Sequence, residues 1–284
     1  MINHEFYAPL ALACEAAGYH SMVVPDSICY PQYSDSKYPF SPDGNREFLE
    51  DKPFIDPFVL ISALGMVTKR LTFTTFVLKL PVRHPVLVAK QAMSCAVMTN
   101  NRLLLGLGVS PWPDDYEICD ISFRTRGKRM NESIEVLTGL FSGEYFEYHG
   151  EIFDIPSIKM APAPTQEIPI LVGGHANAAL ERAAKHGDGW LHGGGDLSEL
   201  PNLLSKLNEY RKRYDRDSKQ FQIFVISPDA WSLDGIRRLE DQGVTDVIVG
   251  FRWPYTKQAD HESLADKLSN LNRFAEDIIS KVSP

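Results

Sequence analysis

Two glycine-rich turns contain backbone that could meet a ligand. Each follows an apolar run expected to be a buried strand: the first is Gly106-Leu107-Gly108-Val109-Ser110, and the second is Gly173-Gly174-His175. Glycine has no Cβ atom, so backbone at such turns can approach a ligand closely. The second turn also precedes a predicted helix, whose first N–H groups have no partner and can bind an anion such as phosphate. A glycine pair at a strand–helix turn is also common for packing alone, so the residues by themselves leave both interpretations open.

Polar side chains gather at the ends of two further predicted strands. Asp26 follows the apolar run His20 to Pro25, where it can either hydrogen-bond a ligand or cap the local backbone. His84 stands next to Pro85 and suits a structural role at the start of a helix. Lys79 and Arg83 add positive charge at the same end. On a chain of net charge −8 they could attract a phosphate or the acidic tail of a cofactor.

These residues must be positioned by alternating strands and helices. The clearest unit is residues 71–110, which read as a strand ended by Pro81, a helix opened by Pro85, and a buried strand from Arg102 to Leu107. The whole chain contains seven such βα repeats and possibly an eighth strand, which predicts a parallel sheet. A doubly wound sheet would show a glycine fingerprint after its first strand, and this sequence has none. We therefore expect a barrel with its active site at the carboxyl ends of the strands.

Three segments give the chain a family resemblance. The segments VLKLPVRHPVLVAKQAM, NRLLLGLGVS and IPILVGGHANAALERAAKHGDGW, together with Arg126-Gly127-Lys128-Arg129 and Glu132, resemble the bacterial-luciferase-like flavin and deazaflavin oxidoreductases. The similarity runs from about Leu10 to Phe251. It implies an α/β fold of the (β/α)8 TIM-barrel type, with residues 1–284 as one domain.

The resemblance also implies where a cofactor binds. Thr75, Phe76 and Val77 match a strand bulge that carries a non-proline cis peptide, here between Phe76 and Val77, and supports one face of the cofactor ring. Phe76 is larger than the residue that many relatives have. The resemblance places the cofactor phosphate near Gly173, Gly174 and His175, and we add Gly108, Val109 and Ser110 as further cofactor-binding candidates.

Two positions depart from the family pattern. Many relatives have a histidine after the aspartate of the second strand, whereas this chain has Ser27; the sugar-phosphate dehydrogenases of the family have a glutamate where this chain has Val109. We therefore do not expect sugar-phosphate activity, and Asp26 and Ser27 are the remaining catalytic candidates. The resemblance implies hydride transfer between coenzyme F420 and a small organic substrate. The alternatives are an FMN-dependent monooxygenase and a non-catalytic flavin-binding protein.

Composition excludes several other classes. The acidic balance, 37 Asp and Glu against 29 Lys and Arg, argues against a nucleic-acid or membrane surface. The four cysteines show no metal-binding spacing, so we expect no metal and a reducing cytoplasm. No stretch is apolar and long enough to span a membrane. The family resemblance, together with apolar helices such as residues 57–68, predicts a homodimer.

Two segments stand outside the repeat pattern. Only residues 1–7 precede the first helix, and Asn3, His4 and Glu5 suit a buried strand poorly, so we expect the first barrel strand to be absent or truncated. The resulting gap would be filled by a rearranged segment, by a partner chain, or by residues upstream of this start. Residues 28–56 form a long loop with aromatic residues including Tyr38, Phe40 and Phe48. It is either a packed surface loop or a lid that stacks on a ligand.

Overall fold

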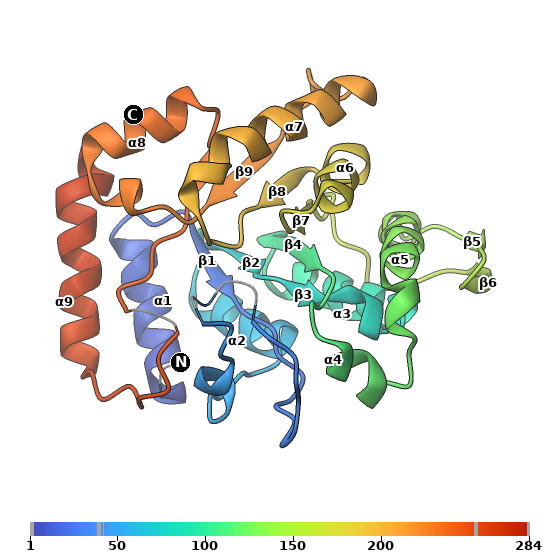
Figure 1. Ribbon diagram of the computed structural model, residues 1–284, viewed down its shortest axis with the longest axis horizontal. Helices are drawn as coiled ribbons and strands as arrows, with labels where there is room; N and C mark the ends of the chain where they lie inside the picture. The colour runs from blue at the N-terminus through green and yellow to red at the C-terminus, as the bar shows by residue number, and fades with distance from the viewer. Residues whose placement is uncertain (1–2, 39–40, 42, 253–254, 283–284) are drawn as a thin grey trace.

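A curled parallel sheet forms the centre of the protein (Figure 1). The computed structural model describes residues 3–38, 41, 43–252 and 255–282, so Phe40 lies outside the described residues. The sheet order is β1-β2-β4-β7-β8-β9-β10, and β3 pairs with β4 beyond the end of β2. Its strands are β1 Ser21–Val24, β2 Thr72–Thr75, β3 Leu78–Lys79, β4 Leu103–Gly108, β7 Ile170–Gly173, β8 Gly189–Leu191, β9 Gln222–Val225 and β10 Asp246–Val247. This sheet confirms the luciferase-like TIM-barrel fold predicted from the sequence.

Helices surround the sheet in the order that the βα pattern predicts (Figure 1). They are α1 Tyr7–Ala16, α2 Pro57–Val67, α3 Pro85–Met98, α4 Pro113–Ile118, α5 Arg126–Phe141, α6 Asn177–His186, α7 Leu200–Arg213, α8 Leu233–Asp241, α9 Leu264–Phe274 and α10 Ser280–Val282. Proline opens α2 and α3 as expected, and the Asp56 side chain caps α2 by accepting from the N–H of Phe58 at 2.9 Å. Among the described residues, no helix combines the length and the apolar character that crossing a membrane requires.

The amino-terminal segment confirms the prediction of a missing first strand for the residues that the structure describes. His4–Phe6 form a short 3-10 helix that continues directly into α1, and Met1 and Ile2 lie outside the described residues. The two edges of the sheet are therefore β1 and β10, and no ladder joins them within the described ranges. Side chains bridge this edge instead. His20 before β1 lies 3.4 Å from Asp246 of β10, and the Tyr19 hydroxyl donates to the carbonyl of Leu271 in α9.

The segment after β4 differs from what the sequence indicates. From the sequence, residues 111–123 are predicted to be irregular, but in the structure α4 occupies Pro113–Ile118. Its sequence has the features of a helix start, with proline first and then Asp114 and Asp115 at the positive end of the helix dipole. The sequence also predicts a last strand over residues 246–251, whereas β10 contains only Asp246 and Val247.

The alternating residues 145–155 around Gly150 predict a hairpin outside the barrel, and the structure contains one. It consists of β5 Phe146–His149 and β6 Asp154–Ile158, and it projects beside α5 (Figure 1). The buried carboxylate of Glu132 in α5 holds its turn, because it accepts from the N–H groups of three successive residues, Glu151 to Phe153, at 3.0 to 3.2 Å. The motif residue Glu132 therefore has a structural role.

Candidate active site

The centre of the candidate site is a break between β2 and β3. The chain leaves β2 after Thr75, passes through a cis peptide bond between Phe76 and Val77, and rejoins the sheet at Leu78. The cis bond is the one implied by the family resemblance, and the structure confirms its position. The Thr75 hydroxyl is buried and donates to the carbonyl of Gly106 at 2.6 Å, so this bulge is fixed to β4.

Three glycines on neighbouring strands leave room for the bulge. A Cβ atom on Gly106 would lie 1.9 Å from the carbonyl oxygen of Thr75, and one on Gly108 would lie 2.6 Å from Val77 Cγ2. A Cβ atom on Gly173 would lie 3.0 Å from Val77 Cγ1. These glycines are therefore required by packing against Thr75 and Val77.

Apolar side chains fill the interior of the barrel beneath the bulge. Leu104, Leu171, Leu191 and Phe224 come from four different strands and form one buried cluster. Phe76, Val77 and Ile248 are partly buried and pack against this cluster. The bulge thus adds to a small apolar surface at the carboxyl ends of the strands, which is a suitable support for a planar ring.

The turn after β7 joins this surface to the start of α6. Gly174 has φ of +122°, a conformation that side chains rarely adopt, and its carbonyl accepts from the indole N–H of Trp190 at 2.9 Å. Ala176 is the N-cap of α6, and among the described residues no side chain caps this helix. Alanine is a poor N-cap, so the first N–H groups of α6 are available to an anion. The turn therefore has the features required of the predicted phosphate site.

Two stacked histidines lie behind this turn. The rings of His175 and His192 are 4.5 Å apart and nearly parallel, at 12°. His175 Nε2 accepts from the N–H of Gly193 at 3.0 Å, so the neutral ring carries its proton on Nδ1. Burial lowers the pKa of both rings, and for His192, which is completely buried and next to His175, the pKa falls to about 4. Both rings are therefore neutral at pH 7.

The pKa of His192 predicts a loss of stability in mild acid. Below pH 6.5 the unfolded chain takes up a proton at this residue, whereas the folded chain does so only near pH 4. The unfolded state binds more protons in this window, so the free energy of unfolding falls as the pH falls, by up to about 3 kcal/mol at this one residue. Denaturant unfolding measured between pH 7 and pH 4 should show this slope, and His192→Gln should flatten it. The comparison variant His149→Gln should not flatten the slope, because Asp154 raises the pKa of this exposed ring and its contribution to the slope has the opposite sign. A slope in His192→Gln equal to that of the wild type would contradict the assignment.

Asp26 is bound to protein groups. Its two carboxylate oxygens accept from the two terminal nitrogens of Arg83 at 2.8 and 2.9 Å, and one of them also accepts from the backbone N–H of Lys79 at 2.9 Å. Only 2% of the Asp26 side chain is exposed. These contacts join the end of β1 to the segment from Lys79 to Arg83, and a catalytic role for Asp26 remains a prediction. Ser27 is half-buried directly after it.

A second buried ion pair joins β3 to α4. Lys79 Nζ lies 2.7 Å from Asp115 Oδ2 and 4.5 Å from the centre of the Trp112 ring. The Ser110 hydroxyl, also buried, donates to the same carboxylate of Asp115 and accepts from the N–H of Trp112. Ser110 thus supports α4 from within, while Val109 before it is half-buried.

A third ion pair fixes the long loop 28–56 over this region. The buried Arg46 donates to Asp114 at 3.0 Å. Its guanidinium also stacks on the Trp112 ring, whose centre is 4.5 Å away. Tyr38 packs against Phe48 and Tyr255, with ring centres 5.2 and 5.4 Å apart. Burial, and then the neighbouring Tyr255, raise the pKa of Tyr38. Tyr38 and Phe48 of this loop thus pack on protein, as in the packed-loop interpretation, whereas Tyr33 is 84% exposed.

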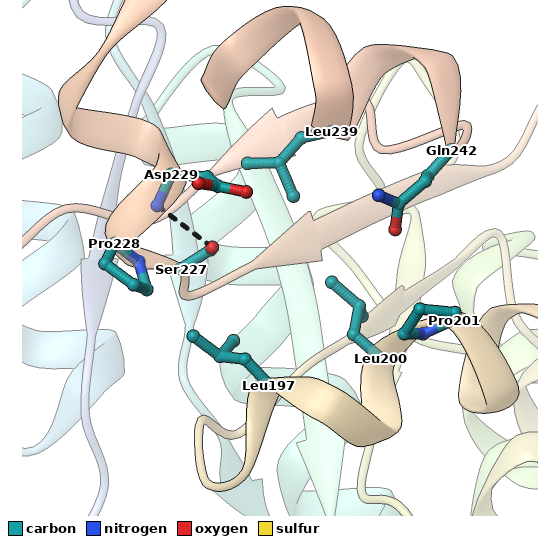
Figure 2. A pocket seen from close by; sticks show the side chains of 8 residues that line it. All are labelled: Leu197, Leu200, Pro201, Ser227, Pro228, Asp229, Leu239 and Gln242. Atoms are coloured by element: carbon teal, nitrogen blue, oxygen red, sulfur yellow. Dashed lines mark hydrogen bonds between the residues drawn. The ribbon is translucent and has the colours of Figure 1, made fainter. Parts of the chain in front are cut away.

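A small cavity lies beyond the end of β9, between the start of α7 and the end of α8 (Figure 2). It encloses about 160 Å³ and is mostly apolar; it is lined by Leu197, Leu200, Pro201, Ser227, Pro228, Asp229, Leu239 and Gln242. Ligand sites for organic cofactors usually occupy about 300 to 1,000 Å³. This cavity is therefore too small for a flavin. The described residues also contain no group of three or more histidine, cysteine, aspartate or glutamate side chains arranged to hold a metal.

The family resemblance indicates the bulge, and the sequence indicates the glycine turn, but several residues that surround these two features could not be identified from the sequence. His192, Asp115 and Trp112 have no motif of their own, and Arg46 lies within a loop that shows no periodic pattern. One signal was available. Pro113 followed by two acidic residues is typical of a helix start, which would have placed Asp115 next to Ser110.

The curled parallel sheet, the cis peptide bond between β2 and β3, and the glycine turns at the carboxyl ends of the strands, which form the mouth of the barrel, match what the resemblance to luciferase-like oxidoreductases implies. The profile of the luciferase-like monooxygenase family matches residues 6–234, and the chain belongs to this family. An uncharacterised protein of Mycobacterium tuberculosis is 60% identical over 99% of this chain and 97% of its own length. The F420-dependent hydroxymycolic acid dehydrogenase of the same species is 28% identical over 61% of this chain and 50% of its own. The coenzyme F420-dependent tetrahydromethanopterin reductase of Methanopyrus kandleri has a similar fold, with a TM-score of 0.74, 14% identity and coverage of 99% of this chain and 96% of its own.

Proposed function

We propose that this oxidoreductase binds coenzyme F420 at the mouth of its barrel and transfers a hydride between this cofactor and a small organic substrate. The observation that carries the proposal is the arrangement of the mouth. An apolar surface at Phe76 and Val77 lies between an uncapped helix start at Ala176 and the buried ion pairs around Trp112. The F420-dependent relatives named above support the same cofactor.

The residues at the mouth fit such a cofactor. A deazaflavin transfers hydride and does not readily activate oxygen, so the protein supplies mainly orientation and electrostatics. Phe76 and Val77 would support the ring, and the N–H groups after Gly173 and Gly174 would bind the phosphate. His175, held by Gly193, would keep the turn in position. Val109 and Ser110 would border the ring on the side of β4.

FMN is the alternative cofactor, and the family description as monooxygenases favours it. The same apolar support and the same helix start suit its ring and its phosphate. Steady-state assays can separate the two functions. Reduced FMN with oxygen should be consumed by a monooxygenase, whereas reduced F420 should be oxidised by an organic acceptor without oxygen. We expect the second result. Oxygen-dependent product formation with FMN alone would favour the alternative, and tight binding with no turnover of either cofactor would favour a non-catalytic flavin-binding protein.

We also propose that the protein is a homodimer that pairs through α2 and α3. Exposed apolar side chains are concentrated on these two helices, which pack against each other; they are Val59, Met66 and Val67 on α2, and Leu87, Val97 and Met98 on α3. Sedimentation velocity at micromolar concentration should show a dimer. Met66→Glu with Leu87→Glu should give monomers, because two charges would then be buried in the interface. Ile118→Glu, in an exposed apolar residue of α4, should leave the dimer intact, and a wild-type monomer would contradict the proposal.

A further inference from the structure

Lys79 is a buried cation at the mouth of the barrel. It is the last residue of β3 and lies opposite Gly108 of β4, so it follows the bulge by two residues at the carboxyl ends of the strands. Only 8% of its side chain is exposed, and its partner Asp115 is 2% exposed. Active sites of parallel barrels form at this end of the strands.

The ammonium group has donors that the protein does not satisfy. It carries three N–H groups, and although Asp115 lies 2.7 Å away, no acceptor within the described ranges meets Nζ with hydrogen-bonding geometry. The indole N–H of Trp112, beside it, is likewise buried without a hydrogen bond among the described residues. A buried donor left without an acceptor costs about 1 to 3 kcal/mol, and more if it is charged. Such groups are expected where a ligand supplies the acceptor.

The surrounding charges indicate which kind of acceptor fits. Three buried or half-buried ion pairs lie at this part of the mouth: Asp26 with Arg83, Lys79 with Asp115, and Arg46 with Asp114. Buried ion pairs contribute little net stability compared with apolar side chains of the same volume, so stability alone does not explain three of them. Each cation is already balanced by one carboxylate. A neutral oxygen acceptor therefore suits Lys79 better than an anion, which Asp114 and Asp115 would repel.

We propose that Lys79 binds the carbonyl oxygen, or in the reverse direction the hydroxyl oxygen, of the substrate, and that it replaces the acid and base that other family members have at the positions of Ser27 and Val109. This inference rests on the proposed function and names the substrate as a neutral carbonyl compound or the corresponding alcohol. When the carbonyl carbon accepts a hydride, its π-electron pair moves to the oxygen. The ammonium of Lys79 donates a proton to that oxygen, giving an alcohol and a neutral amine, and the amine regains its proton from solvent.

The test compares paired substitutions in the full chain. Lys79→Met with Asp115→Asn removes both charges of the pair at nearly constant volume, so neither partner is left as a buried unpaired charge. Lys267→Met with Asp260→Asn does the same at a pair of the same residue types and the same 2.7 Å separation in the first turn of α9, with side chains 10% and 8% exposed, and serves as the matched control. Ligand-observed NMR titrations measure the affinity of cyclohexanone, a neutral ketone, and of cyclohexanecarboxylate, its anionic counterpart, without cofactor. Cofactor affinity is measured separately by absorbance.

We expect the wild type and the Lys267–Asp260 control to bind cyclohexanone alike, and the Lys79–Asp115 variant to bind it about 10- to 100-fold more weakly, as the loss of one charged hydrogen bond predicts. Cofactor affinity should stay within about two-fold in all three, by the additivity of separated sites. An unchanged ketone affinity in the Lys79–Asp115 variant, equal losses in both variants, no ketone binding by the wild type, or tighter binding of the carboxylate would each overturn the proposal. A wild type that binds ketone through Lys79 but binds neither F420 nor FMN would refute the proposed function and leave this site standing.

Discussion

Replacing Gly174 with valine is expected to weaken cofactor binding by about 10- to 100-fold, which corresponds to the loss of one or two charge-assisted hydrogen bonds. Gly174 has φ of +122°, and a Cβ atom there would lie 3.0 Å from the Cβ atom of Ala179 in α6. A β-branched residue cannot adopt this conformation without strain, so the turn must rearrange. The N–H groups that follow it would then no longer point to one phosphate position.

A control is needed because the same substitution also destabilises the fold. Gly243 likewise has a positive φ of +86°, but nothing lies within 4 Å of a Cβ atom there, and it precedes β10 at the opposite end of the strands. Gly243→Val should therefore lower thermal stability with cofactor affinity unchanged. The affinity is measured by absorbance titration of each variant. An unchanged dissociation constant in Gly174→Val would show that the cofactor phosphate does not bind at Gly173, Gly174 and His175.

Asp26→Ala is expected to cost about 3 to 5 kcal/mol of folding free energy, as found when one partner of a buried ion pair is removed. The substitution removes the acceptor of three hydrogen bonds, two from Arg83 and one from the backbone N–H of Lys79, and leaves Arg83 only the carbonyl of Lys79. The Arg83 side chain is only 20% exposed, so solvent replaces the carboxylate poorly. Urea unfolding measures the loss directly.

A double variant distinguishes this structural role from a catalytic one. Asp26→Leu with Arg83→Met removes both charges and should recover most of the stability lost in Asp26→Ala. If Asp26 contacted the substrate instead, turnover would fall in the double variant while stability returned. Recovery of both stability and turnover would make Asp26 a structural residue, and Ser27 would then be the remaining catalytic candidate of that pair.

The elements that could be predicted from the sequence are those with local signals. Pro57 and Pro85 indicate where α2 and α3 begin, and continuous apolar runs indicate β4 and β7, because these features act within a few residues of the chain. The interruption of the strand 71–80 is different. Composition gave no sign of it, and only the family resemblance placed a cis bond at Phe76–Val77.

The contacts that build the candidate site could not be predicted, because they join residues distant in sequence. Arg46 meets Asp114 across 68 positions, and Asp26 meets Arg83 across 57. No spacing in the sequence identifies either pair, because each forms only when the fold brings distant segments together. For the same reason the sequence leaves Asp26 open between a ligand contact and a cap.

The glycines of β4 have a packing role that the sequence did not indicate. Gly106 and Gly108 were expected to let a ligand approach the backbone, and in the structure their missing Cβ atoms make room for Thr75 and Val77. The bulge, and not the glycines of β4, therefore forms the apolar surface at the mouth. Gly108, Val109 and Ser110 as cofactor contacts remain predictions.

The most direct test of the account is an absorbance titration of the purified protein with F420 and, separately, with FMN. We expect a saturable spectral change with F420 and weaker or no binding of FMN. The F420 signal should be lost in Gly174→Val but not in Gly243→Val. Binding of FMN alone would favour the alternative function, an FMN-dependent monooxygenase. No binding of either cofactor to the folded wild type would contradict the central claim.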